Sequence, residues 1–221
     1  MKKVVLIVGI VIGVLFIAAV AAFFLFFRGP DLRQFEVLRD PRITEIPGTK
    51  VIEVRFNGDP NKVIQTAFGV LMKSYFGTAG VKKGPGMSVP VARYDFNLEQ
   101  NRALAAARTD AERAKLVKAA NWRGMAAIPV PESVTEIQAA AADGMEAKLA
   151  RWEYGTVAEI LHVGSYETEW PQIDRLHKFI RDRGYEFCGL HEEVYLRGPG
   201  MPFVKPADYY TIIRYQVRRK K

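Results

Sequence analysis

The chain has 221 residues and a formal net charge of +8, from 32 basic and 24 acidic side chains. At roughly 150 residues per domain, this length predicts one or two domains with a sizeable core. Six of the bases lie at the ends, at Lys2, Lys3 and 218–221, which leaves 26 bases against 24 acids between them. A nearly neutral body argues against a nucleic-acid-binding surface. The lone Cys188 excludes an intramolecular disulfide, and one cysteine with three histidines favours neither a metal site nor a cofactor.

The first 28 residues have the composition of a membrane anchor. Residues 4–27 are 24 residues without a charge, and a helix of that length spans about 36 Å, enough to cross a hydrocarbon core of about 30 Å. A cleavable signal peptide is the alternative, but the apolar run extends past the roughly 7–15 residues usual for one. We therefore expect an uncleaved single-pass anchor. Lys2 and Lys3 favour a body outside the cytoplasm, although Arg28, Arg33, Arg39 and Arg42 follow the run.

The body contains two similar stretches 106 positions apart. Val51 matches Val157, Glu53 matches Glu159 and Gly58 matches Gly164. Each stretch has the alternation of a strand, a tight turn and a second strand, and each glycine precedes residues with helical apolar spacing. Two further strands follow each helix, over 88–94 and 126–130 in the first copy and over 190–196 and 210–215 in the second.

These patterns predict an α+β domain over residues 36–217, built from two ββαββ half-domains at 36–130 and 145–217. Side by side, they would form one antiparallel sheet with two helices on one face and a groove on the other. Residues 29–35 are expected to be a tether and 218–221 a basic tail. The insertion at 97–120 is rich in alanine and charged residues, and it predicts one or two helices that form a solvated cover or a lid over the groove.

A Gly-Pro-Gly-Met sequence occurs at 84–87 and again at 198–201. Neither copy is followed by the Gly-Lys-Ser/Thr of a phosphate-binding loop. We expect both to be turns in equivalent loops that flank the groove.

The stretch from Val157 to Tyr195 resembles the GyrI-like small-molecule-binding domain, the effector-binding domain of some multidrug-responsive transcription activators. The matching residues are 157–166 (VAEILHVGSY), the helix from Leu176 to Gly184, and 193–195 (EVY). The duplicated half-domain also fits this family, and the resemblance covers about residues 36–217. The chain differs from the regulators because the apolar segment stands where they have a DNA-binding helix-turn-helix.

The resemblance implies a ligand groove between the halves, with Glu193 as the acidic residue on its Glu-x-Tyr strand. Aligning Tyr195 with Tyr94 places Ala92 at the position of Glu193, so a single central carboxylate is expected. A carboxylate in an aromatic pocket binds a lipophilic cation by charge pairing and cation–π contact. The candidate ligand-binding residues are Glu193, Tyr195, Tyr166, Trp122, Tyr154 and Trp152.

We therefore expect a membrane-anchored module that binds amphipathic or cationic small molecules and has no nucleic-acid partner. Some GyrI-like proteins resemble hydrolases that open strained rings in toxic compounds, and in that case Glu193 and Tyr195 would supply the acid–base chemistry. The sequence has no G-x-S-x-G motif and no visible activating partner for Cys188. A scaffold for a membrane-protein partner is the third hypothesis.

Overall fold

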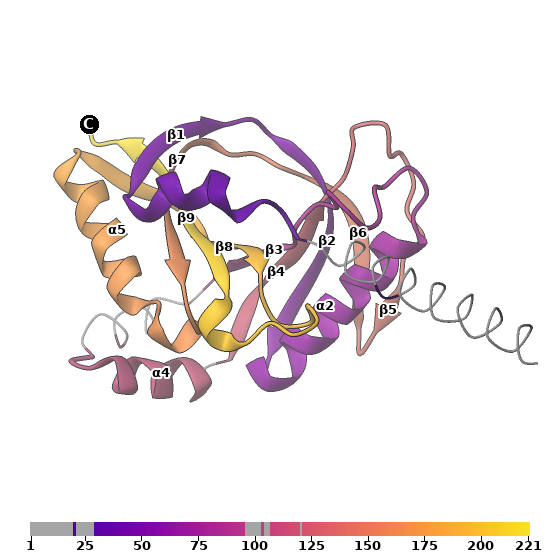
Figure 1. Cartoon of the computed structure of the whole chain (residues 1–221), viewed down its shortest axis with the longest axis horizontal. Coiled ribbons are helices and arrows are strands. Elements are labelled where there is room, and N and C mark those ends of the chain that lie inside the picture. The colour runs from indigo at the N-terminus through magenta and orange to yellow at the C-terminus, as the bar shows by residue number, and fades with distance from the viewer. Residues whose placement is uncertain (1–19, 21–28, 96–102, 104–106, 120) are drawn as a thin grey trace, which may run out of the picture.

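The computed structural model describes residues 20, 29–95, 103, 107–119 and 121–221 (Figure 1). Nine strands form one sheet in the order β1-β7-β9-β8-β3-β4-β2-β6-β5, and every pairing is antiparallel. The strands are β1 (Arg42–Ile46), β2 (Thr49–Gly58), β3 (Val91–Tyr94), β4 (Trp122–Pro129), β5 (Ala141–Ala142), β6 (Met145–Trp152), β7 (Gly155–Val163), β8 (Tyr185–Arg197) and β9 (Tyr210–Arg219). The helical elements are η1 (Leu32–Arg39), α2 (Pro60–Gly77), α4 (Asp110–Ala119), η2 (Tyr166–Thr168), α5 (Trp170–Asp182) and η3 (Pro206–Asp208).

The strand order is symmetric about the central pair, β8 and β3. Moving outward, β9 and β4 come next, then β7 and β2, then β1 and β6. The hairpins predicted at the start of each half do not form, because β1 pairs with β7 and β6 pairs with β2. Alternation along a strand shows which side chains share a face but not which strand lies alongside. The central pairing of β3 with β8 joins the two halves into one continuous sheet, and one strand of each half also pairs with a strand of the other half.

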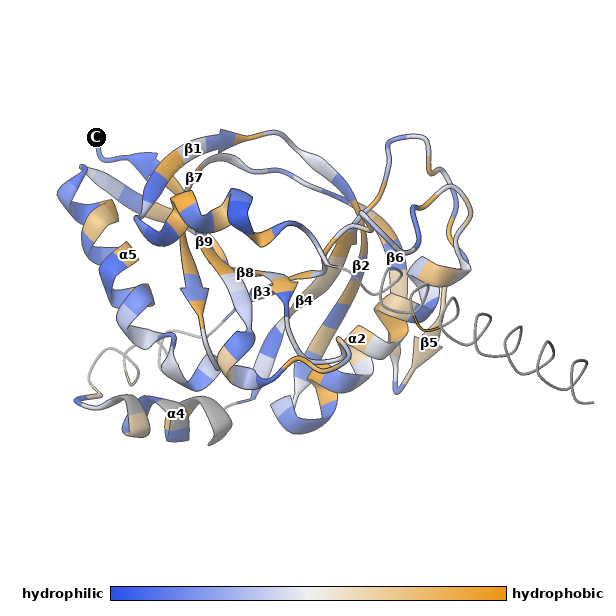
Figure 2. Ribbon diagram, in the orientation of Figure 1, coloured by the Kyte–Doolittle hydropathy of each residue, from blue (hydrophilic) through white to orange (hydrophobic). Residues whose placement is uncertain are grey.

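Two long helices lie over the two wings of the same sheet face (Figure 1). α2 packs on β2, β4 and β6, whereas α5 packs on β7 and β8. The Asp59 side chain caps α2 by accepting from the Asn61 N–H, and Pro60 occupies its first turn. α5 buries a narrow stripe of Ile173, Leu176 and Ile180, and most of this helix is hydrophilic in Figure 2.

The opposite face of the sheet is closed, so the groove predicted there is absent from the described structure. Leu38 of η1 is 1% exposed and packs in a cluster with residues from β2, β3, β4, β6, β7, β8 and β9. Nine strands about 4.8 Å apart are roughly 38 Å wide, while a helix is only about 10 Å across. Two helices therefore cover the wings of their face and leave its centre open between them.

The ends of the domain differ from the predicted boundaries. Residues 32–35 of the predicted tether belong to η1, and Arg218 and Arg219 of the predicted tail belong to β9. Arg218 also pairs with Glu186 at 2.7 Å. Of the anchor predicted over residues 1–28, the structure describes only residue 20. Within the described part of the chain no helix is long and apolar enough to cross a membrane.

Candidate ligand-binding pocket

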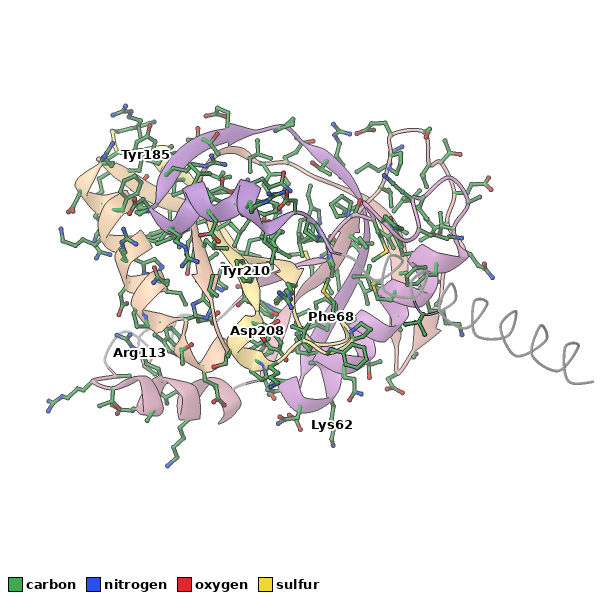
Figure 3. The ribbon with its side chains drawn as sticks, in the orientation of Figure 1. Lys62, Phe68, Arg113, Tyr185, Asp208 and Tyr210 are labelled. Carbon is green, nitrogen blue, oxygen red and sulfur yellow. The ribbon has the colours of Figure 1, made fainter. Side chains whose placement is uncertain are left out.

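A cavity of about 1920 Å³ lies between α2 and α5, above the central strands of the sheet. It is larger than an ordinary ligand pocket of about 300–1000 Å³. Phe68 and Met72 of α2 form one wall, and Ile173 and His177 of α5 form the other. Figure 3 labels Phe68 on α2 and Arg113 on α4.

Helix α4 contributes one described residue to the lining of this cavity. Arg113 lines the cavity and pairs with Asp174 of α5 at 2.7 Å, and its guanidinium lies 5.4 Å from the Trp170 ring centre. Within the predicted insertion the structure describes residues 103 and 107–119, of which 110–119 form α4. The ion pair with Asp174 holds α4 against α5.

The centre of the pocket floor comes from β8. His191, Glu193 and Tyr195 alternate along the strand, so they project to the same face, and all three line the cavity. Glu193 is 7% exposed and lies opposite Ala92 of β3, whose small side chain leaves room above the sheet. The β8–β9 register shifts on both sides of this segment, and such irregularities re-aim side chains near functional sites.

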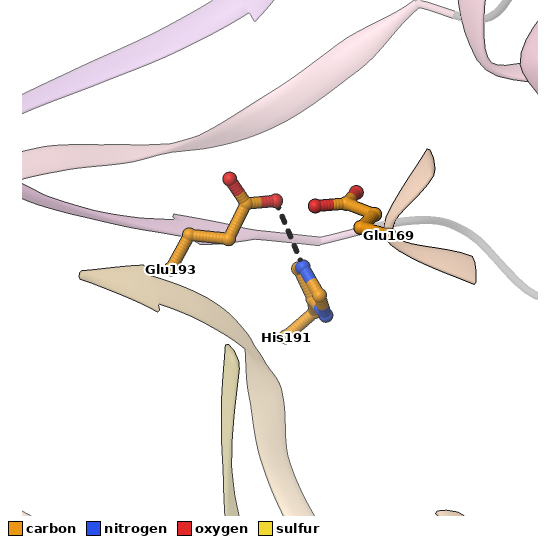
Figure 4. Close-up of side chains that lie close together, drawn as sticks. All are labelled: Glu169, His191 and Glu193. Atoms are coloured by element: carbon orange, nitrogen blue, oxygen red, sulfur yellow. Dashed lines mark hydrogen bonds and ion pairs between the residues drawn. The ribbon is translucent and has the colours of Figure 1, made fainter. Parts of the chain in front are cut away.

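A second carboxylate reaches the same point from the start of α5. One carboxylate oxygen each from Glu169 and Glu193 and one ring nitrogen of His191 lie within 4.8 Å of one another (Figure 4). His191 Nε2 lies 2.9 Å from Glu193 Oε1, and His191 Nδ1 lies 2.7 Å from the Tyr215 hydroxyl. The expectation of a single carboxylate is therefore wrong. The alignment of the two copies compared strand with strand, whereas Glu169 arrives through tertiary packing of a helix.

Burial governs the protonation of this cluster. It raises the pKa of the Glu169 carboxyl well above its usual range, and the negative charge of Glu193 raises it further. Within the part of the chain that the structure describes, the buried Glu169 Oε2 atom has no hydrogen-bond partner. Glu169 therefore favours the protonated form as long as no cation is nearby.

Four tyrosines surround the carboxylates. Burial raises the pKa of Tyr94, Tyr195 and Tyr166, and the charge of Glu193 adds to this effect. Burial likewise raises the pKa of Tyr215, with the charge of Glu169 as the next cause. All four hydroxyls therefore remain protonated at neutral pH.

The aromatic rings of the pocket pack edge to face. Tyr195 lies 5.6 Å from Phe68 and 5.9 Å from Tyr166 between ring centres, and Trp122 lies 5.0 Å from Tyr94. Burial also lowers the pKa of His177 to about 4, so this imidazole is neutral at pH 7. The aromatic rings and the neutral His177 thus give the pocket uncharged surface beside the carboxylates.

The structure brings together four of the six predicted ligand-binding residues. Glu193, Tyr195, Tyr166 and Trp122 line the cavity. The remaining two, Trp152 and Tyr154, lie against the opposite face of the sheet, where Trp152 packs in the cluster around Leu38 and Tyr154 packs against it.

Trp152 and Tyr154 instead belong to a buried charged layer. Trp152 Nε1 donates to Glu53 Oε2 at 2.7 Å, and the Arg93 guanidinium lies 4.1 Å from the Trp152 ring centre and 4.7 Å from that of Tyr154. Alternation along β6 places Trp152 on this face. Aromatic composition alone does not show on which face of the sheet a ring lies.

Glu192 is the charged centre of that layer. It is 2% exposed and pairs with Arg93 at 2.7 Å and with Arg214 at 2.9 Å. Arg214 also pairs with Glu159 at 2.7 Å, and Glu159 with Arg42 at 2.8 Å. Neither carboxylate of this adjacent pair is exposed, since Glu192 lies in the charged layer and Glu193 lies buried at the pocket floor.

Sequence reasoning missed four pocket residues, namely Glu169, His191, Tyr94 and Tyr215. His191 and Tyr94 were within reach, since His191 lies one strand repeat before Glu193 and Tyr94 had been aligned with Tyr195. Glu169, His191 and Glu193 together offer one nitrogen and two oxygen donors. Such a set suits either a divalent metal ion or the charged group of an organic cation.

Comparison with protein-family models gives no match, and comparison with curated protein sequences gives none either. Solved structures do match. An uncharacterized conserved protein from Listeria innocua has a TM-score of 0.57 and 19% identity, covering 85% of this chain and 99% of that one. A hydrolase from Listeria innocua has a TM-score of 0.53 and 16% identity, covering 81% and 92%. The C-terminal domain of EcmrR has a TM-score of 0.54 and 16% identity, covering 82% and 98%.

These likenesses define the fold class. The chain has the α+β fold of the EcmrR C-terminal domain, which confirms the GyrI-like resemblance at the level of the fold.

Proposed function

We propose that this protein binds lipophilic or amphipathic organic cations in the pocket between α2 and α5. The observation that carries the proposal is the position of Glu193. It lies with Glu169 and His191 at the floor of a large cavity that is lined mainly by apolar and aromatic residues, with charged residues of α4 and α5 such as Arg113 and Asp174 at one side. An apolar pocket with a few convergent polar groups is the usual form of a small-molecule site.

The carboxylates select for positive charge. Two carboxylates this close in a partly dry site repel each other, and a proton on Glu169 relieves the repulsion when the pocket is empty. A cation between them would replace that proton. The tyrosine rings would add cation–π attraction, which strengthens when water is excluded.

A pair of ions with the same shape and opposite charge tests the proposal. The full chain in lipid nanodiscs is titrated with tetraphenylphosphonium and with tetraphenylborate, with empty nanodiscs as the blank. We expect saturable binding of the phosphonium alone, and weaker binding in Glu193→Gln. Glu146→Gln is the matched control, because Glu146 lies on β6 with a side chain 56% exposed. Equal binding of both ions, or unchanged phosphonium binding in Glu193→Gln, would refute the proposal.

A hydrolase is the second candidate, and the two unlike carboxyl groups favour it. Environments that separate the protonation of neighbouring acids assign acid and base roles. A protonated Glu169 would serve as the general acid, while Glu193, oriented by His191, would activate water. A panel of reactive esters and strained-ring compounds tests this. Turnover that disappears in both Glu169→Gln and Glu193→Gln would support it, and no turnover across the panel would rule it out.

We also infer that residues 4–27 anchor the domain in a membrane, with the body outside the cytoplasm. The support is the 24-residue run without a charge. Alkaline extraction should leave the chain in the membrane fraction. Cys188 is exposed and is the only cysteine in the sequence, so a membrane-impermeant maleimide should label it in intact cells. Labelling only after lysis would show that the body lies in the cytoplasm, contrary to the proposal.

A further inference from the structure

Two loops converge at one end of the pocket. β3 and β8 are antiparallel neighbours, with Val91 opposite Val194, so the start of β3 and the end of β8 lie at the same edge of the sheet. Residues 82–87 lead toward β3, residues 198–205 follow β8, and both loops contribute to the pocket lining. The prediction that these are equivalent loops of the two halves is wrong, because the first loop precedes β3 and the second follows β8.

The N-terminal end of the domain meets these loops. Gly29 and Pro30 also line the pocket, and a side chain added at Gly29 would lie 3.6 Å from Met201. We call the surface made by 82–87, 198–205, Gly29 and Pro30 the loop rim. The uncharged run of residues 4–27 ends two residues before Gly29. A membrane entered by that run would therefore lie close to the loop rim.

The side chains of the loop rim suit a lipid surface. Phe203 is 79% exposed, the most of any large hydrophobic residue in the described chain. Its φ of +63° is a costly conformation for a bulky residue, of the kind kept at functional positions. Lys82, Lys83 and Lys205 are exposed in the same two loops. An aromatic ring among lysines is the composition that lies at membrane interfaces and attracts anionic headgroups.

We propose that the loop rim docks on the lipid bilayer that residues 4–27 enter, so that this end of the pocket faces the lipid headgroups. Amphipathic molecules concentrated in the bilayer then reach the pocket without crossing water. The inference rests on the proposed anchor, which alkaline extraction tests separately. It does not depend on the identity of the ligand.

The experiment places one environment-sensitive fluorophore at either of two positions of the full chain in phosphatidylcholine–phosphatidylglycerol vesicles. The first position is 203, in the double variant Cys188→Ser/Phe203→Cys. The control is the native Cys188, which is exposed near the other end of β8, about 30 Å away along the strand. Both positions are on the surface, so neither label disturbs the core. Spin-labelled headgroups in the vesicles serve as the quencher.

We expect emission from position 203 to move to shorter wavelength and to be quenched by the headgroups, while emission from Cys188 is neither shifted nor quenched. Equal quenching at both positions, or none at 203, overturns the docking. If the chain nevertheless resists alkaline extraction, the anchor stands and only the docking fails.

A charge variant gives a second readout. Lys82→Gln/Lys83→Gln/Lys205→Gln, added to the position-203 variant, should reduce quenching on vesicles with phosphatidylglycerol and leave it unchanged on phosphatidylcholine alone. Each lysine contributes up to about a fivefold preference for the docked state on an anionic surface. Equal quenching of the parent and the charge variant on anionic vesicles would refute the role of these lysines.

Discussion

Replacing Glu169 by Gln should stabilise the protein at high pH and do much less at low pH. The wild-type carboxyl has a folded-state pKa raised by burial and by Glu193, while the unfolded chain ionises it in the usual range. Between those two values the folded state holds more protons than the unfolded state, so the wild type loses stability as the pH rises through the folded pKa. Gln has no proton to lose and removes this dependence.

The magnitude follows from the geometry of the cluster. The donor atoms of Glu169 and Glu193 lie within 4.8 Å, and two unit charges at that distance repel by about 3.5 kcal/mol at an effective dielectric constant of about 20. In a chain of this size each kcal/mol moves the unfolding midpoint by about 2–4 °C. The midpoint of Glu169→Gln should therefore exceed that of the wild type by roughly 7–14 °C once both wild-type carboxyls are ionised.

Thermal unfolding of the full chain in nanodiscs between pH 5 and pH 9, followed by tryptophan fluorescence, measures this difference. Glu146→Gln is again the matched control and should shift the midpoint little at any pH. A difference between Glu169→Gln and the wild type that is the same at pH 5 and pH 9 would refute the reasoning. So would a variant that is less stable than the wild type at pH 9.

Three further predictions follow from the same contacts. Tetraphenylphosphonium should bind more tightly to the wild type as the pH rises through the folded pKa of Glu169, by up to tenfold per pH unit. Calorimetry in two buffers of different ionisation enthalpy should detect the released proton. An affinity that does not change with pH would contradict this prediction. Glu192→Gln should lower the free energy of unfolding by about 3 kcal/mol, because Arg93 and Arg214, which are both largely buried, lose an ionised partner. Chemical denaturation that shows no loss would contradict this network. Trp152→Phe should cost about 1–3 kcal/mol, because a buried oxygen of Glu53 loses its donor, yet leave phosphonium affinity unchanged; a large affinity loss would return Trp152 to the binding site.

The loop rim and the carboxylate cluster lie at different places along β8. The cluster lies in the middle of the strand and the rim follows its end, so the pocket extends from one to the other. In the proposed arrangement an apolar ligand body enters at the rim while its charge reaches the carboxylates. Mutations at the rim should therefore change the rate of entry, and mutations at the cluster should change affinity.

Local patterns predicted most of the elements correctly. The apolar spacing identified α2 and α5, and the matching glycines indicated two related halves. The resemblance pointed to Glu193 and its tyrosine. These features depend on near neighbours in the chain, which a single sequence displays directly.

Long-range features did not follow from the same patterns. The exchange of β1 and β6 between the halves depends on which strand edge is free, and alternation is silent on that. Glu169 lies in the pocket because of the way α5 packs on the sheet, which the sequence pattern does not show. Trp152 and Tyr154 were predicted in the pocket but lie on the opposite face of the sheet. The groove was predicted on the wrong face of the sheet, because the sequence pattern does not show how much of a sheet face two helices can cover.

The adjacent residues Glu192 and Glu193 show which features depend on the sequence alone and which depend on the tertiary structure. The sequence by itself determined that the two carboxylates point to opposite faces of a strand, because successive side chains alternate. Only the tertiary structure decided what each face holds. One side offers Glu192 two arginines in a packed layer, and the other gives Glu193 a histidine, a second acid and an open cavity. A buried charge is costly without partners, and among the described residues the helices leave a cavity over Glu193, whereas Glu192 is paired within a packed layer.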